Sequence, residues 1–227
     1  MNSPPDVGVL IAAAGQGVRA GGAEPKQFRP IAGVPMLQRA IRPFFGHPRV
    51  RQVVVALPSA HVANPPKWLN PAESNGLRLV VGGATRSQSV KAALEALDPA
   101  CSVVLVHDAA RPFVSKATID AVIAAAARLG VVPAVPVSDT IKRANESTRQ
   151  VIETVDRRGL WRAQTPQGCP RIMLEQAYEM VGAAEFTDES ALLEATGFQV
   201  ELVPDLVSNF KVTTHEDFVV AEAMLGT

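Results

Sequence analysis

Two cations accompany a loop of small residues near the start of the chain. Residues 13–22 read AAGQGVRAGG, which places Arg19 within the loop, and Lys26 follows after Pro25. Glycine and alanine let backbone amides approach a ligand closely. A basic loop of this kind suits a triphosphate, which concentrates about four negative charges in a small volume. The loop is therefore a candidate triphosphate site, with a plain solvated loop as the alternative.

The same loop matches the dinucleotide-binding fingerprint G-x-G-x-x-A at Gly15, Gly17 and Ala20. That fingerprint also requires a helix that opens inside the glycine run and a carboxylate at the end of the second strand. The glycines and prolines between residues 21 and 30 block such a helix, and the apolar run over residues 50–57 ends without a carboxylate. These differences argue against a nicotinamide-dependent dehydrogenase.

Asp108 follows another apolar run, in the sequence HDAARP over residues 107–112. Ligands bind at the carboxyl ends of strands in open α/β sheets. Magnesium commonly takes one or two protein carboxylates and completes its shell with water and phosphate oxygens. Asp108 is therefore a candidate Mg²⁺ ligand. The alternative is that it caps a turn and pairs with Arg111.

Further groups that suit a nucleotide and a second anion are spread along the chain. Gly83 and Ser89 belong to the sequence GGATRSQS over residues 82–89, whose backbone and hydroxyl groups could read the edge of a base. Ser89 could equally be an ordinary residue at a helix N-terminus. Arg157 and Lys211 come from distant segments, and together they could clamp a second anionic substrate.

The elements that must position these residues follow from apolar periodicity. Short apolar runs predict buried strands over residues 7–13, 50–57, 77–81, 103–107, 131–137 and 200–203. Amphipathic patterns predict helices over residues 36–45, 89–97, 116–129, 171–181, 189–195 and 215–225, the last opened by a capping box from Thr214 to Asp217. Alternation of strands and helices predicts an α/β fold with a mostly parallel, doubly wound sheet flanked by helices.

One segment interrupts this alternation. Residues 140–144 and 150–155 are β-like runs joined by the polar turn over residues 145–149, which predicts a hairpin within a β-arm at about 138–160. A polar hairpin has little core to bury against its own domain. It is expected either to project and pair with a second subunit or to lie as an ordinary surface hairpin, and the sequence leaves both interpretations open.

Composition narrows the classes of protein. The 22 Lys and Arg residues balance the 22 Asp and Glu residues, so no overall field indicates a nucleic-acid or membrane-surface binder. Cys101 and Cys169 fit no zinc or CxxC spacing, which indicates a reducing cytoplasm. The first residues resemble neither a signal peptide nor a membrane span. The 227 residues are expected to form one domain.

Taken in order, these blocks resemble the 2-C-methyl-D-erythritol 4-phosphate cytidylyltransferases. The first blocks are the basic loop, the glycine pair with Arg86 and Ser89, and HDAARP. The later blocks are DTIK (139–142), TVDR (154–157), QTPQ (164–167), TDE (187–189) and NFKVT (209–213). The resemblance covers the whole chain. It implies a single Rossmann-like nucleotidyltransferase domain over residues 1–227 and a homodimer held partly by the β-arm. Bifunctional relatives add a cyclase domain, and this chain is expected to be monofunctional.

The resemblance also implies a reaction and a role for each matching residue. CMP would pass from CTP to methylerythritol phosphate, with Mg²⁺ as cofactor and pyrophosphate as the second product. Arg19 and Lys26 would stabilise the transition state, and Arg157 and Lys211 would position the polyol phosphate. Asp108 would sit at the magnesium, Arg111, Thr140 and Thr165 would line the alcohol site, and the nucleotide would contact Ala13, Ala14, Gly15, Gly83 and Ser89. A ribitol 5-phosphate cytidylyltransferase and an inert nucleotide sensor stay open as alternatives.

Overall fold

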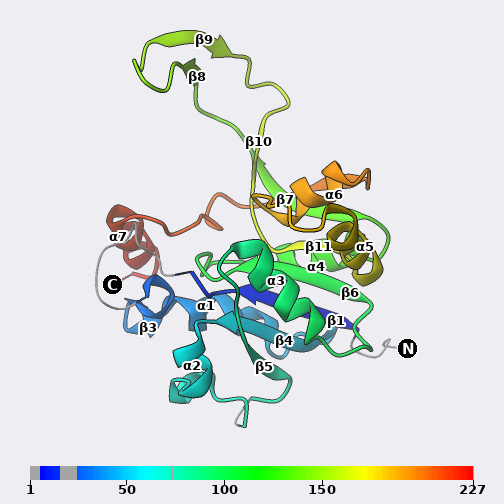
Figure 1. Cartoon of the computed structure of the whole chain (residues 1–227). Helices are drawn as coiled ribbons and strands as arrows, with labels where there is room; N and C mark the ends of the chain where they lie inside the picture. The colour runs from blue at the N-terminus through cyan, green and yellow to red at the C-terminus, as the bar shows by residue number, and fades with distance from the viewer. Residues whose placement is uncertain (1–5, 16–24, 73, 227) are drawn as a thin grey trace.

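Eight strands of the described residues form one mixed sheet, in the order β10-β7-β11-β6-β1-β4-β5 with β12 paired to β7 (Figure 1). The computed structural model describes residues 6–15, 25–72 and 74–226. The strands are β1 (Val7–Ala12), β4 (Val50–Leu57), β5 (Leu77–Val81), β6 (Val103–Asp108), β7 (Gly130–Pro136), β10 (Trp161–Ala163), β11 (Gln167–Pro170) and β12 (Val200–Pro204). β1, β4, β5 and β6 run parallel, whereas β11 lies antiparallel between β6 and β7.

Helices cover both faces of this sheet (Figure 1). They are α1 (Met36–Ile41), α2 (Ser59–Ala63), α3 (Arg86–Glu95), α4 (Lys116–Ala126), α5 (Arg171–Val181), α6 (Glu189–Ala195) and α7 (His215–Met224), with short 3₁₀ helices η2 (Lys26–Phe28), η3 (Arg42–Phe44) and η4 (Lys67–Leu69). Alternate side chains of β1 enter different cores: Val9 and Ile11 cluster with Ile119 of α4, and Leu10 clusters with Val90 of α3. The doubly wound arrangement predicted from the sequence is confirmed.

Local sequence explains where several elements begin and end. The predicted strands over 50–57 and 77–81 and the predicted helices over 171–181 and 189–195 have the observed bounds. Helix α3 begins three residues before its predicted start, because the Thr85 hydroxyl accepts a hydrogen bond from the Gln88 amide at 3.2 Å and caps the helix. Helix α1 ends at Ile41 and continues only as η3, since Pro43 lacks an amide hydrogen. The capping box of Thr214 and Asp217 is confirmed at α7.

The predicted hairpin is present and projects from the sheet. Strands β8 (Ile141–Ala144) and β9 (Val151–Val155) pair antiparallel with each other and with no other strand of the described residues. Two extended connections link them to β7 and β10 at the sheet edge, so the hairpin stands clear of the body of the protein (Figure 1). The hairpin therefore projects, as one of the two interpretations predicted, and its pairing with a second subunit stays a prediction. None of the helices in the described part of the chain is long and apolar enough to cross a bilayer.

Candidate active site

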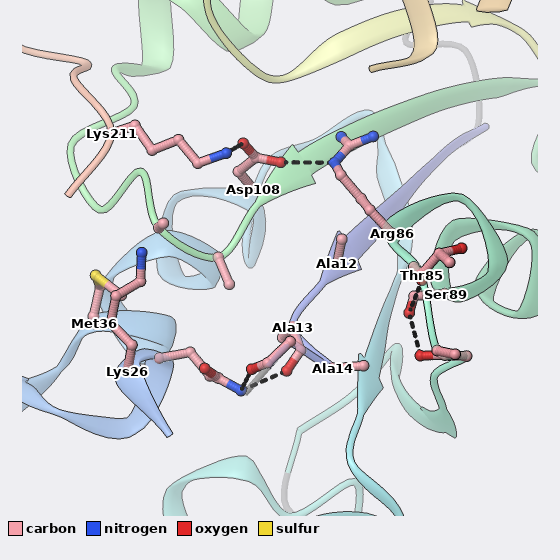
Figure 2. A pocket seen from close by; sticks show the side chains of 16 residues that line it. Ala12, Ala13, Ala14, Lys26, Met36, Thr85, Arg86, Ser89, Asp108 and Lys211 are labelled. Atoms are coloured by element: carbon pink, nitrogen blue, oxygen red, sulfur yellow. Dashed lines mark hydrogen bonds and ion pairs between the residues drawn. The ribbon is translucent and has the colours of Figure 1, made fainter. Parts of the chain in front are cut away.

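A cleft of about 270 Å³ opens at the carboxyl ends of β1 and β6 (Figure 2). Its walls come from the residues after β1, η2, the start of α3, the end of β6 and the segment before α7. The cleft brings together eight residues singled out in the sequence: Ala13, Ala14, Gly15, Lys26, Gly83, Ser89, Asp108 and Lys211. Parallel strands end at the same sheet edge, which explains why distant segments meet there.

The basic side of the cleft is anchored by main-chain contacts. The Lys26 ammonium donates a hydrogen bond to the Val212 carbonyl at 2.8 Å. The neighbouring buried amide of Gln27 donates to the carbonyls of Ala13 at 2.7 Å and Gly15 at 3.1 Å (Figure 2). These bonds tie η2 to the end of β1, so Lys26 projects from a fixed base. Arg19 lies outside the residues that the structure describes.

Small residues let the opposite side of the cleft pack closely. A Cβ atom added at Gly82 would come within 2.3 Å of the Ala14 Cβ atom, so β5 and the loop after β1 approach this closely only with glycine there. The Ser89 hydroxyl points back into its own helix and donates to the Thr85 carbonyl at 2.9 Å (Figure 2). Ser89 lines the cleft, and a hydroxyl oxygen that donates one hydrogen bond can still accept another.

Asp108 ends β6 and faces two cations (Figure 2). Its carboxylate accepts from the Lys211 ammonium at 2.7 Å and from the Arg86 Nε at 3.2 Å. Burial would raise the pKa of this carboxyl, but the charges of Arg86 and Lys211 hold the pKa well below its ordinary value. Asp108 is therefore ionised at every pH at which the protein would work.

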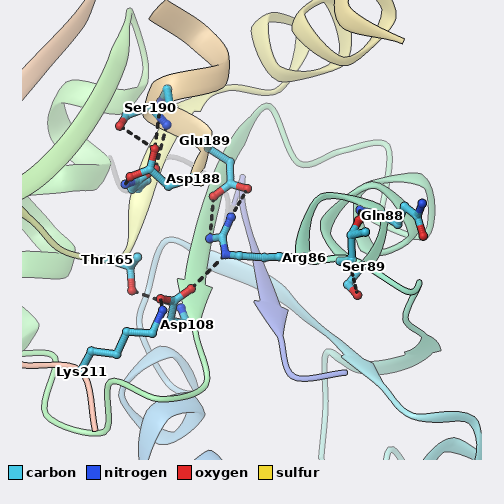
Figure 3. Close-up of polar contacts among 12 residues, drawn as sticks. Arg86, Gln88, Ser89, Asp108, Thr165, Asp188, Glu189, Ser190 and Lys211 are labelled. Carbon is cyan, nitrogen blue, oxygen red and sulfur yellow. Dashed lines mark hydrogen bonds and ion pairs between the residues drawn. The ribbon is translucent and has the colours of Figure 1, made fainter. Parts of the chain in front are cut away.

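Arg86 forms an ion pair with the buried carboxylate of Glu189 behind Asp108 (Figure 3). The guanidinium donates to both oxygens of Glu189, at 2.7 Å and 2.8 Å, while its Nε faces Asp108. Burial alone would lower the pKa of Arg86, but the two carboxylates raise it well above its ordinary value. Both residues belong to blocks that resemble the family, but no site role was predicted for either. No local signal shows that they meet.

A chain of hydrogen bonds supports Asp108 from its backbone side. The buried Thr165 hydroxyl accepts from the Asp108 amide at 3.1 Å and donates to His107 Nδ1 at 2.9 Å. His107 Nε2 contacts the Arg111 carbonyl at 3.0 Å, and because a carbonyl only accepts, Nε2 carries the hydrogen. Burial lowers the pKa of His107 to about 4, so its ring is neutral. Thr165 and Arg111 thus lie behind Asp108, outside the wall of the cleft.

Comparison with known proteins identifies the family. A family model described as 2-C-methyl-D-erythritol 4-phosphate cytidylyltransferase matches residues 7–227. The chain belongs to this family. It is 41% identical, over 98% of its length, to the 2-C-methyl-D-erythritol 4-phosphate cytidylyltransferase of Frankia casuarinae, of which it covers 82%.

Two further family members show the breadth of the match. The crystal structure of the Thermus thermophilus 2-C-methyl-D-erythritol 4-phosphate cytidylyltransferase aligns with a TM-score of 0.80 at 36% identity, covering 96% of this chain and 98% of that one. The bifunctional enzyme IspD/IspF of Desulfotalea psychrophila is 39% identical over 96% of this chain. The chain spans 56% of the length of that bifunctional relative.

Two site residues implied by the family resemblance lie away from the cleft. Thr140 and Arg157 are exposed and belong to the stalk and arm around β8 and β9, which project from the sheet (Figure 1). The two connections of the arm, residues 137–140 and 156–160, form its stalk, and the Arg157 guanidinium on one connection donates to the Ser138 carbonyl on the other. Within one chain, therefore, the arm residues and the cleft residues of this family member do not meet.

The cleft offers one carboxylate for a metal ion. Over the residues that the structure describes, no group of three His, Cys, Asp or Glu side chains could hold a metal. Both Glu189 oxygens are bonded to Arg86, which leaves Asp108 as the carboxylate facing the cleft. Its partner Lys211 has a 44% exposed side chain, which can move aside. This arrangement fits an ion that takes most of its ligands from phosphates and water, as Mg²⁺ commonly does.

Proposed function

We propose that this chain transfers CMP from CTP to 2-C-methyl-D-erythritol 4-phosphate, giving 4-diphosphocytidyl-2-C-methyl-D-erythritol and pyrophosphate in non-mevalonate isoprenoid precursor synthesis. The observation that carries the proposal is the meeting of Lys26, Asp108 and Lys211 in one cleft of a member of this family. Two lysines beside a small-residue wall suit a triphosphate and a phosphate monoester.

The chemistry needs positioning and charge neutralisation more than a base. A phosphate monoester has its second pKa near 6, so the acceptor is already largely dianionic at neutral pH. One of its oxygens forms a bond to the α-phosphorus of CTP while the bond from that phosphorus to the bridging oxygen breaks, and pyrophosphate leaves. Two anions repel strongly as they approach. Lys26 and Lys211 supply opposing charge at fixed positions, which lowers that cost.

Magnesium would be held by Asp108 together with phosphate oxygens of CTP. The ion would neutralise charge on the triphosphate as the reaction proceeds. Asp108 presents an ionised oxygen toward the cleft, and Lys211 is free to turn from that oxygen toward a phosphate. The carboxylate would therefore set where the metal-bound nucleotide lies.

The partners in this proposal are CTP, the polyol phosphate and a second copy of the chain, without nucleic acid or membrane. The arm supports a homodimer, because it projects and exposes Val151 and Ile152 while it carries Thr140 and Arg157 away from the chain's own cleft. In a homodimer, these two polar residues would reach the cleft of the partner. Both cysteines are buried and unpaired, which suits a cytoplasmic protein.

Pyrophosphate release tests the proposal. Enzyme with CTP and MgCl₂ should release pyrophosphate on addition of 2-C-methyl-D-erythritol 4-phosphate, and chelation by EDTA should stop the release. Parallel reactions with ribitol 5-phosphate, and with ATP, GTP or UTP in place of CTP, measure selectivity. Faster turnover with ribitol 5-phosphate would assign the other acceptor. Absence of release with every polyol phosphate would overturn the proposal.

A further inference from the structure

Glu189 is a buried carboxylate next to the cleft that the proposed reaction does not use. Its side chain is 4% exposed, and both its oxygens accept from Arg86, which is 24% exposed and lines the cleft. Charged side chains are rarely buried unless paired. The pair bridges the first residue of α3 and the first residue of α6, which lie 103 positions apart (Figure 3).

The position of Glu189 is fixed independently of Arg86. Asp188 caps α6 and accepts from the Ala191 amide at 2.9 Å. The side chain of Gln167 on β11 donates to Asp188 at 2.9 Å and accepts from the Ser190 amide at 2.8 Å (Figure 3). Glu189 therefore stands on a helix start that is bonded to the sheet, and this gives it a rigid base from which to hold a flexible arginine.

The charges around Asp108 explain why the bond between Glu189 and Arg86 matters. Arg86 and Lys211 carry two positive charges, and Asp108 and Glu189 carry two negative charges, so the group is neutral. Without Glu189, the two terminal nitrogens of Arg86 would lose these partners, and only its Nε would keep a bond, to Asp108. A partly exposed guanidinium in the cleft is a strong phosphate ligand. It would compete for the triphosphate and pull away from Asp108.

We propose that Glu189 is a positioning residue, which holds Arg86 against Asp108 and withholds its guanidinium from the phosphates of the nucleotide. Phosphate contacts then fall to cations that reach the reacting groups, Lys26 and Lys211 among them. The orientation of Asp108 is set from two sides, by Thr165 at its amide and by Arg86 at its carboxylate. The inference rests on the proposed function, because it assigns Glu189 a role in that reaction.

The Glu189→Gln substitution keeps the shape of the side chain and removes its charge. We expect kcat to fall about 10-fold or more, because Asp108 loses its orientation. We expect the dissociation constant for CTP, measured by isothermal titration calorimetry, to fall several-fold, because the cleft gains one net positive charge. If Glu189 had only a structural role, its substitution would lower the melting temperature and leave both kcat and the CTP dissociation constant unchanged. Glu179→Gln, on the exposed face of α5, is the matched control for the loss of one negative charge.

A double-mutant cycle tests whether Glu189 affects kcat through Asp108. If Glu189 acts through Arg86 on Asp108, then Glu189→Gln should lower kcat much less in an Asp108→Asn background than in the wild-type background, measured under single-turnover conditions. Independent, multiplying effects would overturn the inference. So would a kcat and a CTP dissociation constant in Glu189→Gln both within about twofold of wild type, the scatter allowed for independent sites.

A second variant and the activity of the wild type separate the possible outcomes. If Glu189→Gln does not fold, Glu189→Asp decides, because it keeps the charge but retracts the carboxylate by one methylene. A lowered kcat without tighter CTP binding supports the inference, and wild-type kcat contradicts it. Wild-type enzyme that binds CTP but releases no pyrophosphate would count against the proposed function, whereas an active wild type beside an unaffected Glu189 variant would count against this inference alone.

Discussion

The two lysines of the cleft are held by internal partners before any substrate binds. Lys26 donates to the Val212 carbonyl, and Lys211 donates to Asp108. The residue that accepts from Lys26 follows Lys211 directly in the chain, so the two cations are placed by one segment. In the proposed reaction, substrate phosphates would replace these partners, and the side chains would need little reorganisation to meet them. Such preorganisation is the main source of electrostatic stabilisation in active sites.

Removing the first of these cations should mainly affect the chemical step. We expect Lys26→Ala to lower kcat by about 10²-fold or more, by analogy with the loss of one preorganised charge stabiliser. Lys91→Ala removes an exposed lysine of α3 and serves as the control, with kcat near that of the wild type. Steady-state pyrophosphate release, with circular dichroism to check folding, gives the comparison. Near-normal turnover in folded Lys26→Ala would contradict the role of this residue.

The buried ring of His107 should make stability depend on pH. Burial lowers its pKa from 6.5 to about 4, so the folded protein binds fewer protons than the unfolded chain between these values. Its contribution is present above about pH 6.5 and is lost as the pH falls toward 4, by roughly 3 kcal/mol of unfolding free energy. Urea unfolding at several pH values should show this slope. His107→Gln should flatten it, and an unchanged slope in that variant would contradict the assignment.

Residue types and strand ends were enough to predict most of the cleft. Asp108 could be placed because it follows a buried strand, and the small residues after β1 could be placed for the same reason. The partner of Arg86 could not, because a contact over 103 positions depends on how α6 packs against the sheet. Thr165 illustrates a second limit, since a hydroxyl in a recognised block can serve the neighbouring backbone instead of a ligand.

At the scale of elements, long apolar runs were predicted well and short strands were missed. β4 ends in a run of five buried apolar residues, Val53 to Leu57, and its predicted bounds match those observed. β11 has the sequence QGCP, without a single β-branched or aromatic residue, and it is a strand because it fills the space between β6 and β7. β10 spans only three residues at the sheet edge. Tertiary packing, which no local pattern records, determines both.

In the proposed homodimer, a charge on the apolar surface of the arm should weaken the contact between subunits. Ile152 on β9 is 64% exposed, and burial of such a side chain between subunits contributes about 1.5–3 kcal/mol. We expect Ile152→Asp to shift the protein toward monomer, as measured by sedimentation velocity over a range of concentrations. Met180→Asp on α5 is a matched control, because Met180 is 65% exposed and lies outside the arm. A dimer unaffected by Ile152→Asp would place the subunit contact elsewhere.

At the scale of the whole molecule, the two halves of the proposed site lie in different places. The cleft holds Lys211, while Arg157 stands on the stalk of the arm (Figure 1). A homodimer with exchanged arms would complete each cleft with a partner's arm. Catalysis would then require assembly, and dilution below the dimer dissociation constant should lower activity per chain. Such a homodimer would also cover the surface of the arm that is solvent-exposed within one chain.

Mixing two inactive variants tests this division directly. Arg157→Ala leaves the cleft intact, Lys211→Ala leaves the arm intact, and each homodimer alone should be nearly inactive. After subunit exchange, about half of the dimers are mixed, and each mixed dimer has one site with both residues, so activity should recover to about one quarter of wild type. The readout is pyrophosphate release before and after exchange. Lys67→Ala mixed with each variant is the control, because exchange leaves its number of complete sites, and so its activity, unchanged. If Arg157 instead serves the cleft of its own chain, no mixed dimer contains a complete site and mixing restores nothing.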